Sequence, residues 1–277
     1  MKKNQFVLSF GLVLVAVFST YFATNQAAQQ VQTARSDFEY QIGGVLYMQK
    51  AAEYRALCLQ AFNWARIVLE EDEKNKKKLP KAERKMPRAV VVDIDETKLN
   101  NSPAQAAGIR NNVPFNQKDW YAWGEMRKAK AIPGAVDFAT FARSKGVRIF
   151  YVSNRDEAQK QATIDNLKAV GFPDISAENV LLREKESTKE PRRLSISAKY
   201  RIVTLLGDNL NDFSDVFERK SVADRFAEVD QAAALWGNKF IVLPNAMYGD
   251  WENAVYEYQR LTEAQKAEKR INALELP

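Results

Sequence analysis

The sequence contains no histidine among its 277 residues. This absence excludes a histidine general base, a phosphohistidine intermediate and a histidine metal ligand. Hydrolysis by a Ser-His-Asp triad, histidine-based zinc sites and the histidine type of phosphatase mechanism are therefore ruled out. Any catalysis must use carboxylates, Lys, Tyr or Ser.

Cysteine is almost absent as well. The single Cys58 excludes an intrachain disulfide, and no Cys or His cluster could hold a structural zinc ion. Cys58 falls in a helix predicted over Met48 to Glu71, where we expect it to pack rather than react. The phosphate-binding pattern G-x-x-x-x-G-K-[ST] is also missing, which argues against a P-loop enzyme.

The net charge is mild. Lys and Arg outnumber Asp and Glu by 41 to 35, which gives +6, and the two lysines of the N-terminal segment account for part of it, leaving 6 − 2 = +4. No basic stripe interleaved with aromatic residues occurs. We therefore expect small anionic partners rather than a nucleic acid polymer.

The N-terminus has the pattern of an export signal. Lys2 and Lys3 precede an apolar stretch from Phe6 to Phe22, and small and polar residues follow. We predict a signal over residues 1–28, cut near Ala27 or Ala28, with an uncleaved anchor as the alternative and as the only membrane contact. The expected location is the periplasm or the cell surface of a bacterium. No cysteine there could carry a lipid.

Alternating apolar runs and helical patterns predict the fold class of residues 29–277, which begin with a polar lead-in to Tyr47. A charged stretch over residues 70–85 is expected to be a solvated helix end and loop. The predicted strands are Ala89–Val92, Val147–Val152, Ile202–Leu206 and Phe240–Leu243, and the predicted helices between them are Ala135–Ser144, Glu157–Val170 and Leu194–Lys199. This alternation predicts an α/β domain with a doubly wound parallel sheet flanked by helices.

Residues Lys98 to Ile132 interrupt this alternation, with no clear strand and several aromatic side chains. The stretch is longer than an ordinary connection. We predict a mostly helical cap inserted over the strand ends, with a helix packed on the body as the alternative.

Two carboxylates, Asp93 and Asp95, come directly after the first apolar run. Their mutual repulsion requires a cation or a catalytic use, and a hard divalent metal with oxygen ligands would supply the cation. Asp93 could attack phosphorus and form an aspartyl phosphate. Asp95 could protonate the leaving oxygen and later activate water.

The later strand ends add matching groups. Gly207 permits a tight turn before Asp208, and Asp212 follows one helical turn later. Asp208 would bind the metal with Asp93, while Asp212 could bind it or orient its waters. Ser153 and Asn154 could donate hydrogen bonds to a phosphate, with helix capping as the alternative. A lysine near the third cluster would neutralise developing charge.

These segments resemble a known family. The stretches Asp93-Ile-Asp-Glu-Thr-Lys-Leu-Asn-Asn-Ser-Pro and Leu206-Gly-Asp-Asn-Leu-Asn-Asp-Phe213 are similar to the paired signatures of bacterial class C (DDDD) acid phosphatases of the haloacid dehalogenase (HAD) superfamily, especially the outer-membrane lipoprotein e(P4) type. Further familial segments include Phe150-Tyr-Val-Ser-Asn-Arg155 and Leu243-Pro-Asn-Ala-Met-Tyr-Gly-Asp-Trp251. The resemblance runs from about residue 40 to 260.

The resemblance implies a Mg²⁺-dependent phosphomonoesterase with a HAD-like fold and an acidic pH optimum. Asp93 would be the nucleophile and a metal ligand, and Asp95 the general acid/base, with its backbone carbonyl on the metal. Asp208 would be a metal ligand, Asp212 would complete the acidic set, and Ser153 matches the phosphate-binding hydroxyl. The superfamily lysine best matches Lys189, with Lys185 as the alternative.

Relatives of this type favour nucleoside 5′-monophosphates, nicotinamide mononucleotide and aromatic phosphates, as 5′-nucleotidases do. Trp120, Trp123 and Tyr248 match the role of stacking against a flat ring, with core packing as the alternative. Ala104 stands where an aromatic residue commonly follows Asn-Ser-Pro, so one wall of the substrate slot is missing. The missing lipobox cysteine also means that a lipoprotein anchor does not carry over.

Other functions stay open at this point. A sugar-phosphate phosphatase or phosphomutase could use the same core. An exported haem-binding protein belongs to a different class, but it would lack the commonest axial ligand, histidine. A receiver-type signalling domain also uses acidic clusters, but the export segment and the cap argue against it. For the assembly of the chain, a homodimer is one of the open alternatives.

Overall fold

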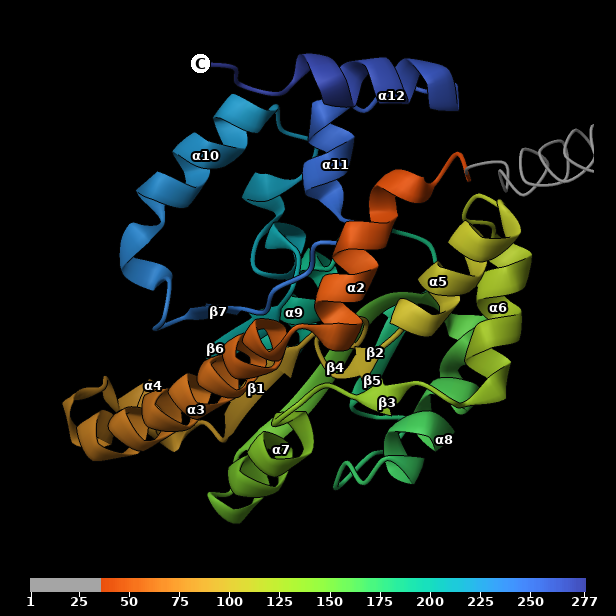
Figure 1. The fold of residues 1–277 in the computed structure, drawn as a ribbon. Coiled ribbons are helices and arrows are strands. Elements are labelled where there is room, and N and C mark those ends of the chain that lie inside the picture. Colours follow the sequence, from red (N-terminus) through yellow and green to blue (C-terminus); the bar gives the residue numbers. More distant parts are fainter. Residues whose placement is uncertain (1–35) are drawn as a thin grey trace, which may run out of the picture.

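The computed structural model describes residues 36–277, so the predicted signal over residues 1–28 lies outside the described residues. Figure 1 shows a central sheet with helices on both sides. Between residues 36 and 277, none of the helices has the length and apolar character needed to cross a membrane.

Five parallel strands form the sheet in the order β5-β4-β1-β6-β7. After β1 the chain moves outward to β4 and β5 and then returns to β6 on the other side of β1. Ligands of such sheets bind where the order reverses, beyond the carboxyl end of the central strand. The strands are β1 (Arg88–Val92), β4 (Arg148–Asp156), β5 (Val180–Arg183), β6 (Arg201–Gly207) and β7 (Phe240–Val242).

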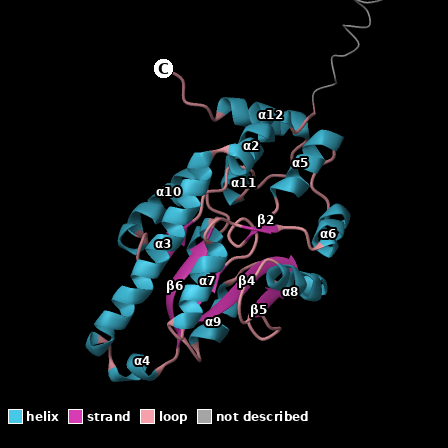
Figure 2. Cartoon of the chain, turned by 60° about the horizontal axis from the view of Figure 1, so that its bottom comes forward, coloured by secondary structure: helices cyan, strands magenta, loops and turns pink. Residues whose placement is uncertain are grey.

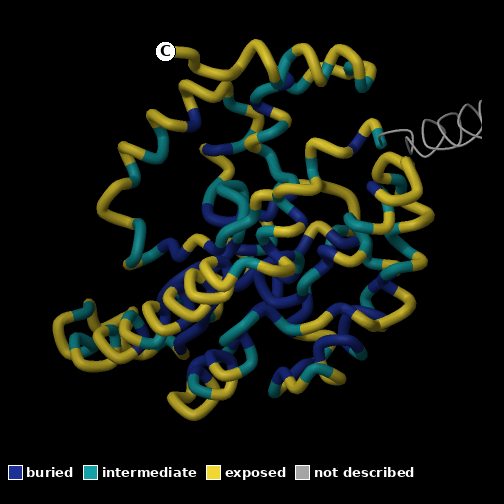
Figure 3. The backbone as a smooth tube through the Cα atoms, viewed as in Figure 1, coloured by how far each residue is buried: buried dark blue, intermediate teal, exposed yellow. Residues whose placement is uncertain are grey.

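Alternate residues of β1 face two different apolar layers. Val90 and Val92 join the larger core with α3 (Ala52–Asn75), α7 (Ala135–Ser144) and α8 (Lys160–Ala169). Ala89 and Val91 join the smaller core with α9 (Glu190–Ser197) on the opposite face. A strand buried on both faces explains the continuous apolar run in the sequence. Figure 3 shows this burial concentrated in the middle of the molecule.

The remaining helices lie around the carboxyl ends of the strands and at the periphery (Figures 1 and 2). They are α2 (Ile42–Lys50), α4 (Lys81–Lys85), α5 (Ser102–Asn111), α6 (Gln117–Met126), α10 (Val222–Gln231), α11 (Asp250–Val255) and α12 (Glu263–Asn272). Short 3₁₀ turns supplement them at Glu39–Gln41, Lys76–Lys78, Glu157–Gln159, Leu210–Asp212, Asp215–Phe217 and Ala233–Leu235.

Several predicted boundaries were wrong. The lead-in predicted up to Tyr47 becomes helical from Ile42, and extended backbone at Ala51 (ψ 128°) divides the predicted helix Met48–Glu71 into α2 and α3. Strand β5 was missed. The charged stretch over residues 70–85, expected to be a helix end and loop, also contains a 3₁₀ turn and α4.

The interrupting segment, residues 98–132, folds as two helices and a small ribbon. Helices α5 and α6 are flanked by β2 (Leu99–Asn100) and β3 (Lys130–Ala131), which pair antiparallel. The expectation of no strand here was therefore wrong, although each strand has only two residues. Figure 2 shows this segment beside the carboxyl ends of the main strands.

Candidate active site

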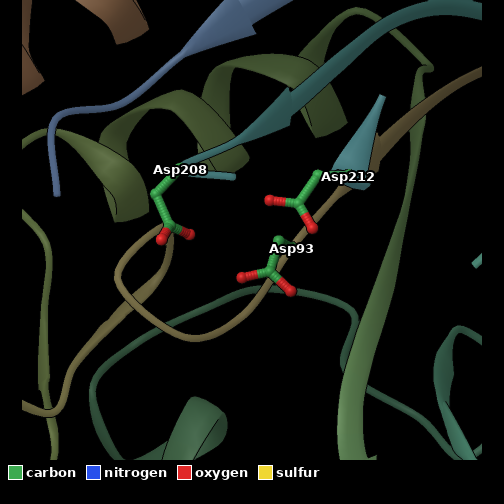
Figure 4. Close-up of side chains that lie close together, drawn as sticks. All are labelled: Asp93, Asp208 and Asp212. Atoms are coloured by element: carbon green, nitrogen blue, oxygen red, sulfur yellow. The ribbon is translucent and has the colours of Figure 1, made fainter. Parts of the chain in front are cut away.

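Three carboxylates meet at the carboxyl ends of β1 and β6. Asp93 follows β1, Asp208 follows β6, and Asp212 ends the 3₁₀ turn Leu210–Asp212. One oxygen of each carboxylate lies within 4.8 Å of the others. Figure 4 shows the three side chains close together. Asp93 and Asp212 are buried and Asp208 is partly exposed.

The local sequence explains how Asp212 reaches the cluster. Asn209 caps the 3₁₀ turn, and its backbone N–H donates to Asp212 Oδ2 at 3.0 Å. A Cβ atom at Gly207 would lie 2.3 Å from Asp212 Oδ2 and 2.4 Å from Asp212 Cβ. Gly207 is the last residue of β6, and its φ angle is not positive. The expected tight turn at Gly207 is therefore wrong, because the glycine is needed for space.

Lys189 reaches the cluster and Lys185 does not. The Lys189 ammonium is buried; it donates to Asp212 Oδ1 at 2.6 Å and also contacts Asp93 Oδ1. Burial alone would lower the pKa of this ammonium, but the charges of Asp212 and Asp93 outweigh burial and raise it. Lys185 is exposed in the loop before α9.

The carboxylates carry more charge than Lys189 can balance. Three carboxylates less one ammonium leave two negative charges, which matches one divalent cation. Burial raises the pKa of Asp93; the charge of Lys189 opposes this rise, and the charges of Asp212 and Asp208 add to it. Burial also raises the pKa of Asp208, as does the charge of Asp212. An all-carboxylate donor set suits a hard cation, so these residues fit a divalent metal site.

Asp208 is oriented by two neutral donors. Thr97 Oγ1 donates to Asp208 Oδ1 at 3.1 Å, and Asn245 Nδ2 donates to Oδ2 at 2.9 Å. Both residues stand in segments that follow strands, β1 and β7. Three strand ends therefore support the same carboxylate.

The Asp95 carboxylate does not join the other three. It forms an ion pair with Arg155, whose Nη2 lies 2.7 Å from Oδ1. Asn101 Nδ2 also donates to Oδ1 at 2.7 Å, and Ser153 Oγ donates to Oδ2 at 3.2 Å. The predicted metal contact of Asp95 through its backbone carbonyl stays a prediction.

Ser153 and Asn154 both lie within β4, near its carboxyl end. Ser153 is buried, and its hydroxyl accepts the Arg155 backbone N–H at 3.1 Å while donating to Asp95. Asn154 is exposed, and its side-chain oxygen accepts from Arg192 Nη2 at 2.7 Å. Neither residue caps a helix. Their phosphate contacts remain predictions.

Comparison with known proteins identifies the family. The family described as HAD superfamily, subfamily IIIB (acid phosphatase), matches residues 4–251. The chain belongs to this acid phosphatase family.

Related proteins agree with this assignment. The class C acid phosphatase from Bacillus anthracis has 38% identity and a TM-score of 0.81, with 87% of this chain and 99% of that chain covered. Its structure with tungstate bound gives 40% identity and a TM-score of 0.80, with 87% and 98% covered. Acid phosphatase 1 of Solanum lycopersicum is 25% identical over 130 residues, or 44% of this chain. The chain spans about half, 50%, of the length of that tomato protein.

These likenesses confirm the predicted family, the α/β fold class and the enzyme class of the acid phosphatases, which are phosphomonoesterases.

In this acid phosphatase the three predicted aromatic residues lie near the Asp95 side of the site. Trp123 Nε1 donates to Asn101 Oδ1 at 2.8 Å, and the Tyr248 hydroxyl donates to Glu96 Oε2. Both rings also pack against the larger core. The Trp120 ring lies 5.4 Å from the Arg155 guanidinium. Their stacking against a substrate remains a prediction. Ala104 lies in α5, where its backbone N–H donates to the Asn101 carbonyl at 2.9 Å.

Glu96 is a buried carboxylate that sequence reasoning did not single out. Its left-handed backbone (φ 58°) turns the chain after Asp95, and it accepts the Asn101 backbone N–H at 2.7 Å. Burial, together with the charge of Asp95, raises the pKa of Glu96 to about 8. Glu96 thus holds both Asn101 and Tyr248 by hydrogen bonds.

Sequence reasoning also missed residues that contact the four acids or the neighbours of those acids. Asn101 and Arg155 lie inside segments that resemble the family, but the resemblance did not assign a role to either residue. Nothing in the spacing indicates which acid each would contact. The missed residues are Glu96, Thr97, Asn101, Arg155, Arg192 and Asn245.

Proposed function

We propose that the chain is an exported, Mg²⁺-dependent acid phosphatase that hydrolyses small phosphomonoesters through an aspartyl phosphate on Asp93. The observation that carries the proposal is the set of three carboxylates with Lys189 at the switch point of the sheet, where the strand order reverses beside β1. Tungstate, bound in the Bacillus anthracis relative, is a tetrahedral oxyanion like phosphate, and this supports an oxyanion site in the same fold.

The chain's own residues supply each step of this chemistry. An Asp93 oxygen attacks phosphorus, the bond to the ester oxygen breaks, and that oxygen takes a proton from Asp95. Asp95 then takes a proton from water, whose oxygen attacks phosphorus and releases Asp93 and inorganic phosphate. Lys189 holds Asp93 and Asp212 in place beside the reacting group. A Mg²⁺ ion held by Asp93, Asp208 and Asp212 would offset negative charge on the phosphate oxygens.

The nucleophile assignment is tested by Asp93→Asn. This change should abolish hydrolysis of 4-nitrophenyl phosphate while leaving the circular dichroism spectrum unchanged, because the amide cannot attack phosphorus. The matched control is Asp137→Asn, an exposed acid on α7, which should keep its activity. EDTA should inactivate the wild type, and added Mg²⁺ should restore it. Near-normal turnover by Asp93→Asn would refute the nucleophile assignment.

The proposed substrates are nucleoside 5′-monophosphates, nicotinamide mononucleotide and aromatic phosphates. Trp123 and Tyr248 support this choice, because hydrogen bonds fix their polar ends and so orient the rings. Ala104 leaves one side of the slot without an aromatic ring, which favours sugar phosphates as the second candidate. Comparing kcat/KM across nucleotides, nicotinamide mononucleotide and sugar phosphates decides between them. A preference for sugar phosphates would refute the nucleotide assignment.

A further inference from the structure

The Asp95 carboxylate is surrounded by donors on both of its oxygens. Arg155 provides three contacts, from Nε to Oδ1 at 3.0 Å, from Nε to Oδ2 at 3.1 Å, and from Nη2 to Oδ1 at 2.7 Å. Asn101 adds a donor to Oδ1 and Ser153 adds one to Oδ2. A two-point contact from a planar guanidinium fixes the plane of a carboxylate as well as its distance.

Arg155 itself is closed off from solvent, with 3% of its surface exposed. Its Nη1 donates to Thr163 Oγ1 at 3.2 Å, and its Nη2 also donates to Asn101 Oδ1 at 3.3 Å. All three guanidinium nitrogens are thus engaged by protein groups. Arg155 therefore acts on a bound ester only through Asp95 and its neighbours.

Both tryptophans of α6 contact a partner of Asp95. Trp123 Nε1 donates to the same Asn101 oxygen that accepts from Arg155, so Asn101 joins Trp123, Arg155 and Asp95. Trp120 lies with its ring 5.4 Å from the Arg155 guanidinium, within cation–π range. One residue therefore separates each tryptophan from the carboxylate of Asp95.

We propose that Arg155 and Asn101 are positioning residues that couple the tryptophans of α6 to Asp95. A leaving group seated against α6 would then meet a carboxyl group already aimed at its oxygen. The inference rests on the proposed phosphatase function and on the acid role of Asp95.

Leaving groups of different basicity test this role. With Mg²⁺ present, a 4-nitrophenolate leaves with little need for a proton, whereas the alkoxide of an alkyl phosphate such as ethyl phosphate needs one. Arg155→Met should lower kcat for ethyl phosphate by about 100-fold and for 4-nitrophenyl phosphate by about 10-fold or less, since general acid catalysis contributes about 10²- to 10⁴-fold. Arg88→Met is the matched control, because Arg88 is also buried in an ion pair but lies at the amino end of β1.

Trp123→Phe separates coupling from simple stacking. It keeps a ring for the substrate but removes the indole N–H that Asn101 accepts, so we expect kcat for ethyl phosphate to fall about fivefold with KM nearly unchanged. Arg155→Lys keeps the charge without the two-point contact and should lie between wild type and Arg155→Met. These two variants decide the matter if thermal unfolding shows that Arg155→Met does not fold.

Two results would overturn the coupling. One is an equal loss for both esters in the Arg155 variants, and the other is a Trp123→Phe enzyme altered in KM alone. A wild-type enzyme that hydrolyses neither ester with Mg²⁺ would instead overturn the proposed function, and the positioning role with it. The wild-type reaction thus distinguishes the two failures.

Discussion

At the scale of single residues, the missing side chain of Gly207 leaves the space that the Asp212 carboxylate occupies. An alanine there would push Asp212 away from Asp93 and Lys189. The clash is between the new Cβ atom and the Asp212 side chain, so a change in the φ and ψ angles of residue 207 would not relieve it. The cost would therefore appear in metal binding and activity, because Asp212 is part of the carboxylate cluster.

We expect Gly207→Ala to raise the Mg²⁺ concentration for half-maximal activity by about 10- to 100-fold, the range seen when groups around a metal ligand are disturbed. Activity measured across a Mg²⁺ titration checks this. Gly43→Ala is the control, because a Cβ atom at Gly43 on α2 meets nothing within 4 Å. A normal Mg²⁺ dependence in Gly207→Ala would show that Asp212 tolerates the displacement.

Lys98 is a second residue whose surroundings are unusual. Its ammonium is fully buried between the rings of Phe62 and Phe138, at 4.5 and 4.9 Å from their centroids. Among residues 36–277 it has no hydrogen-bond partner. Burial lowers the pKa of Lys98 to about 7. The two rings offset part of the cost of the charge.

The pKa shift of Lys98 should make the free energy of unfolding depend on pH. The folded pKa lies below the unfolded value of 10.5, so the unfolded chain binds more protons between pH 7 and 10.5, and the Lys98 contribution to stability rises with pH across that window. Lys98→Met should remove this slope and stabilise the protein at pH 7 by about 1–4 kcal/mol, less than the full shift of about 5 kcal/mol. Urea unfolding of both proteins at pH 7 and pH 10 measures the difference. An unchanged slope would mean that Lys98 is not desolvated.

The place of a residue in the site could be predicted from the sequence where it depends only on the strand that the residue follows. Asp93, Asp208 and Asp212 each follow a strand, and parallel strands end at one edge, so their meeting follows from the sequence pattern. Arg155, the partner of Asp95, lies where the pairing of β4 with β5 is irregular, between Val152 and Asp156. A contact of this kind cannot be predicted from the spacing of residues in the sequence, because the partners are 60 residues apart.

At the scale of elements, the edge strand β5 shows why short strands are missed when strands are predicted from the pattern of apolar residues. Val180–Arg183 has four residues, and its burial alternates between buried and half-buried. The preceding Asn179 holds it in place: Nδ2 donates to the Ile149 carbonyl at 2.9 Å and Oδ1 accepts the Ser176 N–H at 2.9 Å. The strand is thus specified by a buried amide as much as by its own side chains.

We expect Asn179→Ala to destabilise the protein by about 2–3 kcal/mol, because it leaves the buried Ile149 carbonyl with one partner fewer. The free energy of unfolding in urea measures this. Asn238→Ala is the control, since the Asn238 side chain donates to the Ala234 carbonyl at 3.0 Å in an exposed turn. Equal effects in the two variants would show that β5 does not depend on the amide.

The helix predictions differed for physical reasons. The helix predicted over Ala135–Ser144 matches α7, because its apolar stripe is buried against both α3 and β4 of the sheet. The predicted helix Met48–Glu71 spans two elements, because its apolar periodicity continues through Ala51 while the backbone does not. Periodicity reports which faces are buried, and it is insensitive to one extended residue.

At the scale of the whole molecule, the carboxylate cluster ties stability to metal binding. Asp93, Asp208 and Asp212 approach from two strands on either side of the switch point, so their repulsion acts on the packing of the sheet. A ligand that binds only the folded state adds to the free energy of unfolding in proportion to the logarithm of its concentration. A divalent cation should therefore stabilise the entire domain.

Mg²⁺ at about 100 times its Kd should add about 2.7 kcal/mol to the free energy of unfolding, seen as a higher Tm than in EDTA. Asp208→Asn removes one of two uncompensated charges, so it should raise the Tm in EDTA and largely abolish the rise with Mg²⁺. Asp230→Asn, an exposed acid on α10, is the control and should respond as wild type does. If Asp208→Asn lowered the Tm in EDTA, its bonds to Thr97 and Asn245 would outweigh the repulsion, and the charge balance assigned to the site would be wrong.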